Sequence, residues 1–140
     1  MTDERKLRVA ALVYLAGLAL HTADHLRRGL DAVTHHVFWL GNVSTAVGIV
    51  AVVLILTGHR YAPMLAVAFG FPVAIGVAAV HLLPEWSTAL SDSFVDQSVS
   101  WMSWTVVIIE IVGALATGIF GLRLLRGTEP TTASTRQAPA

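Results

Sequence analysis

Polar and apolar residues follow one another along this chain in long blocks rather than in short periodic steps. Four apolar blocks are nearly free of charge, and each extends over about twenty residues, the length that crosses a bilayer. A helix of that length is about 30 Å long at 1.5 Å per residue, which matches the hydrocarbon core. The pattern predicts four transmembrane helices, at residues 9–26, 37–57, 62–83 and 101–122.

The apolar residues within each block are continuous, whereas membrane β-strands alternate between lipid-facing and inward-facing positions. We therefore expect an all-α membrane protein, a four-transmembrane-helix bundle that forms one domain over residues 1–126. The remaining segment, residues 127–140, is rich in Thr, Pro and Ala. This composition predicts a disordered tail.

The overall composition agrees with a membrane protein. Hydrophobic residues make up 55% of the chain and charged residues only 13%, whereas about a quarter of a typical soluble domain is charged. The formal net charge is zero and the sequence has no basic cluster with interleaved aromatic residues, which argues against nucleic acid as a partner. The absence of cysteine excludes disulfides, thiolate catalysis and cysteine-ligated zinc or iron–sulfur centres.

Arg and Lys residues are distributed unequally between the two sides of the predicted bundle. With four spans, both termini lie on one side, and cytoplasmic segments are typically enriched in Arg and Lys. We therefore expect cytoplasmic termini and a multi-pass protein of the inner (plasma) membrane; the bias toward Ala, Val, Gly and Arg suggests a GC-rich bacterial genome. The cationic residues on the side of the termini are Arg5, Lys6, Arg8, Arg60, Arg123 and Arg126, and those on the opposite, outer side are Arg27 and Arg28.

Ionisable residues gather near the end of the first predicted helix. His21 and His25 are four residues apart and share one helical face, and Asp24 lies three residues from His21 on the same side. With Arg28 at the outer interface, His21 lies roughly 10 Å inside the membrane boundary. Ionisable groups at such depth are costly and usually face the interior of the bundle.

The third and fourth helices add further candidates. His81 and Glu85 are four residues apart at the outer end of the third helix, although Pro84 interrupts the turn between them. Glu110 lies near the middle of the fourth helix, on the face that carries the small residues Gly113 and Ala114. Small residues mark helix–helix contacts, so we expect Glu110 to point into the bundle.

Imidazole and carboxylate groups together suit Zn, Fe, Cu or Ni. We therefore interpret this cluster as a site near the outer face for a transition metal (Zn, Fe or Cu) or a haem. The candidate ligands or orienting residues are His21, Asp24, His25, His81, Glu85 and Glu110.

Two other functions fit the same residues. Glu110 and His21 are candidate stations on a proton, ion or small-solute path, with a pore formed by oligomers. The polar residues are equally compatible with a structural or accessory subunit, in which they only join helices through hydrogen bonds. The sequence contains no clear nucleophile arrangement, so we do not assign an enzymatic activity. The lipid bilayer is the expected partner, and a homo-oligomer or another membrane protein is compatible with the pattern.

Several polar residues around the cluster receive simpler interpretations. We expect His35 and His36 to be interfacial polar residues at the start of the second helix. Asp92 and Asp96 are expected to be solvated loop residues or helix-capping residues. Arg27 and Arg28 are expected to contact lipid headgroups.

The strings His21-Thr-Ala-Asp-His25-Leu-Arg-Arg and His81-Leu-Leu-Pro-Glu-Trp resemble small four-span membrane proteins of unknown function from GC-rich bacteria. This resemblance covers the chain up to about Arg126 and implies a topology but no activity. His21-x-x-x-His25 also resembles a histidine box of membrane fatty-acid hydroxylases, but the pair at 35–36 lacks the leading histidine, because Ala32 occupies that place. Ceramidase-like membrane hydrolases combine His, Asp and Ser but have more spans than this chain can supply.

Overall fold

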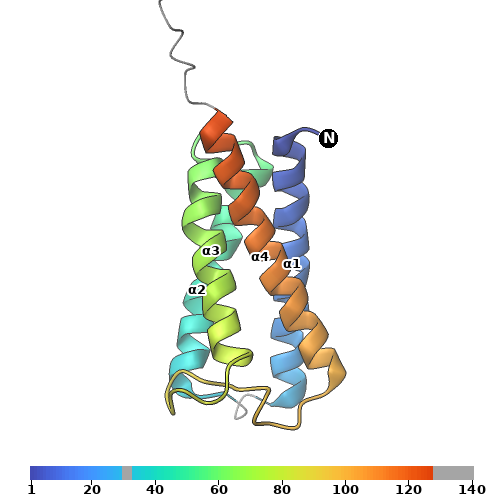
Figure 1. The fold of residues 1–140 in the computed structure, drawn as a ribbon, viewed down its shortest axis with the longest axis vertical. Coiled ribbons are helices and arrows are strands. Elements are labelled where there is room, and N and C mark those ends of the chain that lie inside the picture. Colours follow the sequence, from blue (N-terminus) through green and yellow to red (C-terminus); the bar gives the residue numbers. More distant parts are fainter. Residues whose placement is uncertain (30–32, 128–140) are drawn as a thin grey trace, which may run out of the picture.

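The computed structural model describes residues 1–29 and 33–127, and this part of the chain is an all-helical bundle (Figure 1). All four helices are long and apolar enough to cross a membrane, which confirms the predicted fold class. The tail predicted to be disordered lies outside the described residues from position 128 onward. The helices are α1 (Asp3–Arg28), α2 (His35–Leu56), α3 (Ala62–His81) and α4 (Trp101–Gly127).

Helices α1 and α4 extend beyond the predicted spans because hydropathy marks only the lipid-embedded part of a helix. α1 begins at Asp3, since the Thr2 side chain caps the helix and accepts a hydrogen bond from the Arg5 N–H at 3.3 Å. Conversely, α3 ends at His81, before the predicted end at Leu83. Pro84 disfavours helical backbone at the residue that precedes it, which explains the earlier end.

Helix α4 runs between α1 and α3 and packs closely against both (Figure 1). A Cβ atom at Gly113 would lie 2.5 Å from the Tyr14 backbone nitrogen, and one at Gly17 would lie 2.6 Å from the Glu110 Cα atom. On the other side of α4, a Cβ atom at Gly70 of α3 would lie 2.6 Å from the Ala114 carbonyl oxygen. The backbones therefore approach as closely as glycine allows, as in small-residue packing of membrane helices.

Helices α1 and α3 do not pack directly on each other. No Cα atom of α1 lies within 8 Å of a Cα atom of α3, and α2 contacts both of them on the side away from α4. Large side chains fill the space between α1 and α3 in the middle of the bundle, where the Tyr14 and Phe69 rings meet edge to face at 5.1 Å. Leu18 and Val73 extend the same buried apolar core.

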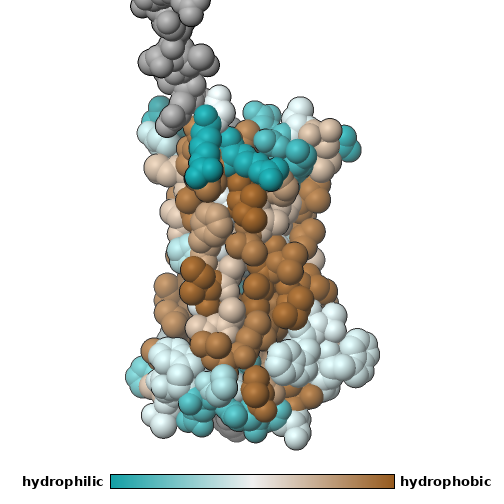
Figure 2. All heavy atoms as spheres, viewed as in Figure 1, coloured by the Kyte–Doolittle hydropathy of each residue, from teal (hydrophilic) through white to brown (hydrophobic). Residues whose placement is uncertain are grey.

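The surface separates into a hydrophobic band and two hydrophilic ends (Figure 2). We call the end at which α1 and α3 finish the histidine end, and the end at which α1 begins the opposite end. Trp39, Trp86 and Trp101 are exposed near the histidine end. Indole rings favour the membrane–water interface, so this arrangement fits a multi-pass protein in a lipid bilayer.

Candidate metal centre

Three histidine side chains from two helices meet at the histidine end. His21 and His25 project from α1, and His81 projects from the last position of α3. The centroids of their rings lie 4.5 Å (His21–His25), 4.8 Å (His21–His81) and 5.6 Å (His25–His81) apart. One nitrogen from each ring falls in a group whose members are all within 4.8 Å of one another. The cluster therefore bridges two helices whose backbones do not touch.

The clustered side chains are largely buried within the bundle, as expected for residues that face its interior. His21 and His81 are only 7% and 3% exposed, and His25 is half-buried. Glu110 of α4 is 3% exposed, which confirms that it faces the bundle interior. An ionisable side chain that is buried to this extent needs a polar partner.

Glu110 provides that partner for His21. Its Oε2 atom lies 2.5 Å from the His21 Nδ1 atom. The contact follows from the close approach at Gly17, one turn before His21, where α4 presents the Glu110 backbone to α1. A carboxylate only accepts hydrogen bonds, so in the neutral form of His21 the Nδ1 atom donates to Glu110 and the Nε2 atom has a free lone pair.

Asp92 plays the same part for His81. The His81 Nδ1 atom lies 3.1 Å from the Asp92 carbonyl oxygen and 3.3 Å from its Oδ2 atom. The loop after α3 folds back to reach this position, since the Asp92 N–H donates to the Val80 carbonyl at 3.0 Å and the Phe94 N–H donates to the His81 carbonyl at 2.9 Å. Both neighbours of the His81 Nδ1 atom are acceptors, so its Nε2 atom is also free to bind a metal.

Two ring nitrogens in the cluster have no hydrogen-bond partner within the described part of the chain. These buried atoms are Nε2 of His21 and Nδ1 of His25. Leaving such a group unpaired costs about 1–3 kcal/mol. In a tetrahedral zinc site with bonds of 2.0–2.1 Å, neighbouring nitrogens are about 3.3 Å apart. A small inward movement of the three rings from their present separation would form such a site.

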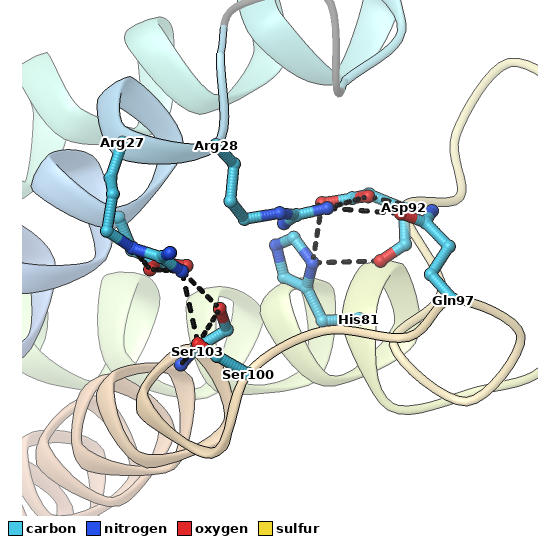
Figure 3. Close-up of polar contacts among 8 residues, drawn as sticks. Arg27, Arg28, His81, Asp92, Gln97, Ser100 and Ser103 are labelled. Carbon is cyan, nitrogen blue, oxygen red and sulfur yellow. Dashed lines mark hydrogen bonds and ion pairs between the residues drawn. The ribbon is translucent and has the colours of Figure 1, made fainter.

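Asp92 and Arg28 were both assigned wrongly from the sequence. Asp92 is 1% exposed rather than solvated. Instead of extending toward lipid headgroups, Arg28 donates two hydrogen bonds to the Asp92 carboxylate, at 2.9 and 3.0 Å (Figure 3). Burial by itself would raise the pKa of Asp92, but hydrogen bonds from His81 and Arg28 outweigh it and hold the pKa well below its usual value. Asp92 is therefore a buried anion paired with a buried cation.

The other two predicted candidates lie outside the cluster. Asp24 is buried, but its Oδ1 atom accepts a hydrogen bond from Arg27 at 2.8 Å, and Arg27 also donates to Ser103 (Figure 3). Glu85 is exposed in the loop because α3 has already ended, so it does not share a helical face with His81. Its backbone N–H donates to the exposed side chain of Asp96.

The remaining histidines of the histidine end stay apart from the cluster. His35 and His36 are exposed at the start of α2, as expected for interfacial residues. The Nε2 atom of His35 accepts a hydrogen bond from the Trp39 indole at 2.9 Å. They therefore serve as natural controls for experiments on the three clustered histidines.

Three histidine ligands leave a fourth position of a tetrahedral metal open. Structural zinc sites usually have four protein ligands, whereas sites that bind a water or substrate have three. The arrangement is thus suited to an exchangeable or reactive metal ion. No protein-family model, curated protein or solved structure matches this chain.

Proposed function

We propose that this protein is a multi-pass membrane protein that binds one transition-metal ion through His21, His25 and His81. The observation that carries the proposal is the convergence of three ring nitrogens to within 4.8 Å of one another. Two buried nitrogens of this cluster have no partner among the described residues, and a metal ion would satisfy them.

The two carboxylates complete the proposed site by holding the far nitrogens of the ligands. Metal-bound histidines almost always donate their other N–H to a carboxylate, a carbonyl or a water, which fixes the tautomer and the ring orientation. Glu110 stands in this position for His21, and Asp92 stands there for His81. Among the described residues, His25 has no such partner for its Nδ1 atom, so it is the most adaptable of the three ligands.

Zinc, iron or copper fits this site better than haem. Imidazole is a ligand for all three metals. The three rings already pack against one another with centroids 4.5–5.6 Å apart, so a flat macrocycle cannot enter without displacing them. We therefore favour a single ion over a haem.

The alternatives from the sequence explain less of the geometry. A purely structural role accounts for the bond between His21 and Glu110 but leaves the unpaired nitrogen of His25 without a purpose. A transport path with a pore formed by oligomers would use His21 and Glu110 but gives no reason for His25 and His81 to converge on His21. Metal binding uses all three histidines.

We further propose that the termini are cytoplasmic and that the site lies toward the outer face of the inner (plasma) membrane, on the basis of the Arg and Lys distribution. A reporter fused after Arg126 should be active in the cytoplasm, and one inserted at the exposed Thr88 should be active outside. The reverse pattern would place the histidine end in the cytoplasm.

Elemental analysis of protein purified without chelator tests metal binding. We expect about one zinc, iron or copper ion per chain, as three converging histidines would hold. His81→Ala should lose the ion, whereas His35→Ala should retain it because His35 lies outside the cluster. A wild-type protein that contains no metal, and takes up none when zinc, iron or copper is added, would overturn the proposal.

A further inference from the structure

The loop segment Asp92–Phe94 packs over His81 of the cluster at the histidine end. All three residues are nearly inaccessible, with exposures of 1%, 3% and 2%. The Phe94 ring lies 4.7 Å from the His81 ring and 5.6 Å from the Trp104 ring. Two backbone hydrogen bonds to the last turn of α3 keep the segment in this place.

A side chain from α1, the helix that carries His21 and His25, binds this segment. Arg28, the last residue of α1, forms both hydrogen bonds to Asp92, and its guanidinium lies 5.0 Å from the centre of the Phe94 ring. Gln97 supports the contact by donating to Asp92 and accepting from Arg28, each at 3.1 Å (Figure 3). The ion pair is nearly buried, with side-chain exposures of 10% for Arg28 and 0% for Asp92.

Among the described residues, the two sides of the cluster differ in character. Toward the opposite end, the buried side chains of Tyr14, Leu18, Phe69 and Val73 belong to one apolar core. Toward the histidine end, a cavity of about 350 Å³ lies beside the ion pair and is lined by Arg27, Arg28, residues 97–100 and Ser103. Because the segment 92–94 packs on the His81 ring, an ion from this side would reach His81 by displacing that segment.

We propose that residues 92–94 form a gate over the histidine cluster and that Arg28 is the latch that keeps it closed. The gate opens when the two hydrogen bonds between Arg28 and Asp92 break and the two backbone hydrogen bonds to α3 then follow, which frees Phe94 from His81 and exposes the His81 ring. The inference that the gate controls metal exchange rests on the proposed function, whereas the gate itself is a property of the loop.

The chain contains no cysteine, so a single introduced thiol reports on the gate without any metal. In a Ser93→Cys protein we expect slow modification by a water-soluble maleimide. Adding Arg28→Gln should speed the modification at least about tenfold, and Arg28→Lys should have an intermediate effect because it keeps the charge but loses the paired geometry.

Arg27→Gln is the matched control. Arg27 is the preceding residue and also pairs with an aspartate, but that partner, Asp24, lies on its own helix rather than on the gate. A second thiol, Val107→Cys at a position with 0% exposure in α4, should stay unmodified in the Arg28→Gln background and so separates gate opening from unfolding. Equal modification of Cys at position 93 with and without Arg28→Gln would overturn the latch, as would fast modification in the otherwise unchanged protein.

Metal release tests the link to the proposed function. If the protein holds zinc, an excess of chelator should remove it at least about tenfold faster from Arg28→Gln than from wild type or Arg27→Gln, with the same starting metal content. Equal release rates would contradict control of exchange by the gate while the metal site stands. If the wild-type protein holds no metal, the proposed function fails and the thiol experiment alone decides whether the gate exists.

Discussion

The bundle is held together in two different ways along its length. In the middle and toward the opposite end, α4 contacts its neighbours through small residues, as at Gly70 and Gly121, where an added Cβ atom would lie within 3 Å of another helix. Toward the histidine end, the contacts between helices are polar and specific, as in the pairs His21–Glu110 and Arg28–Asp92. In the first region the contacts are made by closely packed backbones, and in the second polar side chains add specific contacts between the helices.

This difference separates the residues that stabilise the fold from the residues to which we assign the proposed function. Close packing of small residues needs no polar group. The histidine end instead buries several ionisable groups at a depth where each is costly, and leaves nitrogen atoms of His21 and His25 without a partner in the described structure. Such a cost is typical of a functional site, and a bound metal ion would offset it.

The largest effect should come from breaking the small-residue region. Gly70→Leu places a side chain where a Cβ atom already lies 2.6 Å from the backbone of α4, so α3 and α4 must separate. We expect a loss of stability larger than the roughly 1–3 kcal/mol of ordinary overpacking. Little or no monodisperse protein should then remain after purification. Gly76→Leu on the same helix is the control, since nothing lies within 4 Å of its Cβ position. A Gly70→Leu protein as stable as Gly76→Leu would contradict the packing described here.

A smaller effect, confined to the histidine end, is expected from Glu110→Gln. The amide keeps the size of the side chain but loses the charge that orients the His21 ring, so metal affinity should fall by about 10–100-fold. Asp24→Asn is the matched control, because Asp24 is a buried carboxylate at similar depth that contacts Arg27 rather than a histidine. Titration of metal into both variants would measure this, and an equal loss of affinity in the two would refute a specific role for Glu110.

The smallest effect concerns the boundary between the two regions. The Tyr14 hydroxyl is buried and has no hydrogen-bond partner among the described residues, although its ring packs on Phe69. Tyr14→Phe should therefore leave thermal stability unchanged or raise it by about 1 kcal/mol, since it removes an unpaired polar group. A marked loss of stability would mean that the hydroxyl has a hydrogen-bond partner, so that the core around Tyr14 and Phe69 is not purely apolar.

The features that follow from depth in the membrane were predictable from the sequence. Hydropathy placed the four helices, and the cost of exposing charge to lipid placed His21, His81 and Glu110 in the interior. The error at Glu85 came from counting helical spacing across Pro84, although α3 ends at His81.

Asp92 and Arg28 could not be placed by such arguments, because their positions depend on how a long loop folds back on the helix before it. The sequence does carry a weak signal: Asp92 follows His81 by eleven residues in a segment rich in serine and turn-forming residues, which is compatible with a return to the end of α3. Only the tertiary contacts with Val80 and Arg28 distinguish this from a solvated loop.

The most direct test of the three-histidine site is the effect of added metal on thermal unfolding in detergent. A metal that bridges α1 and α3 stabilises the folded state by about 2.7 kcal/mol at a free concentration one hundred times its Kd. We predict a higher Tm for the wild-type protein with zinc, iron or copper, and no change for His81→Ala, which removes the ligand from α3. A wild-type Tm that none of these metals raises, or an equal rise in His81→Ala, would contradict the account.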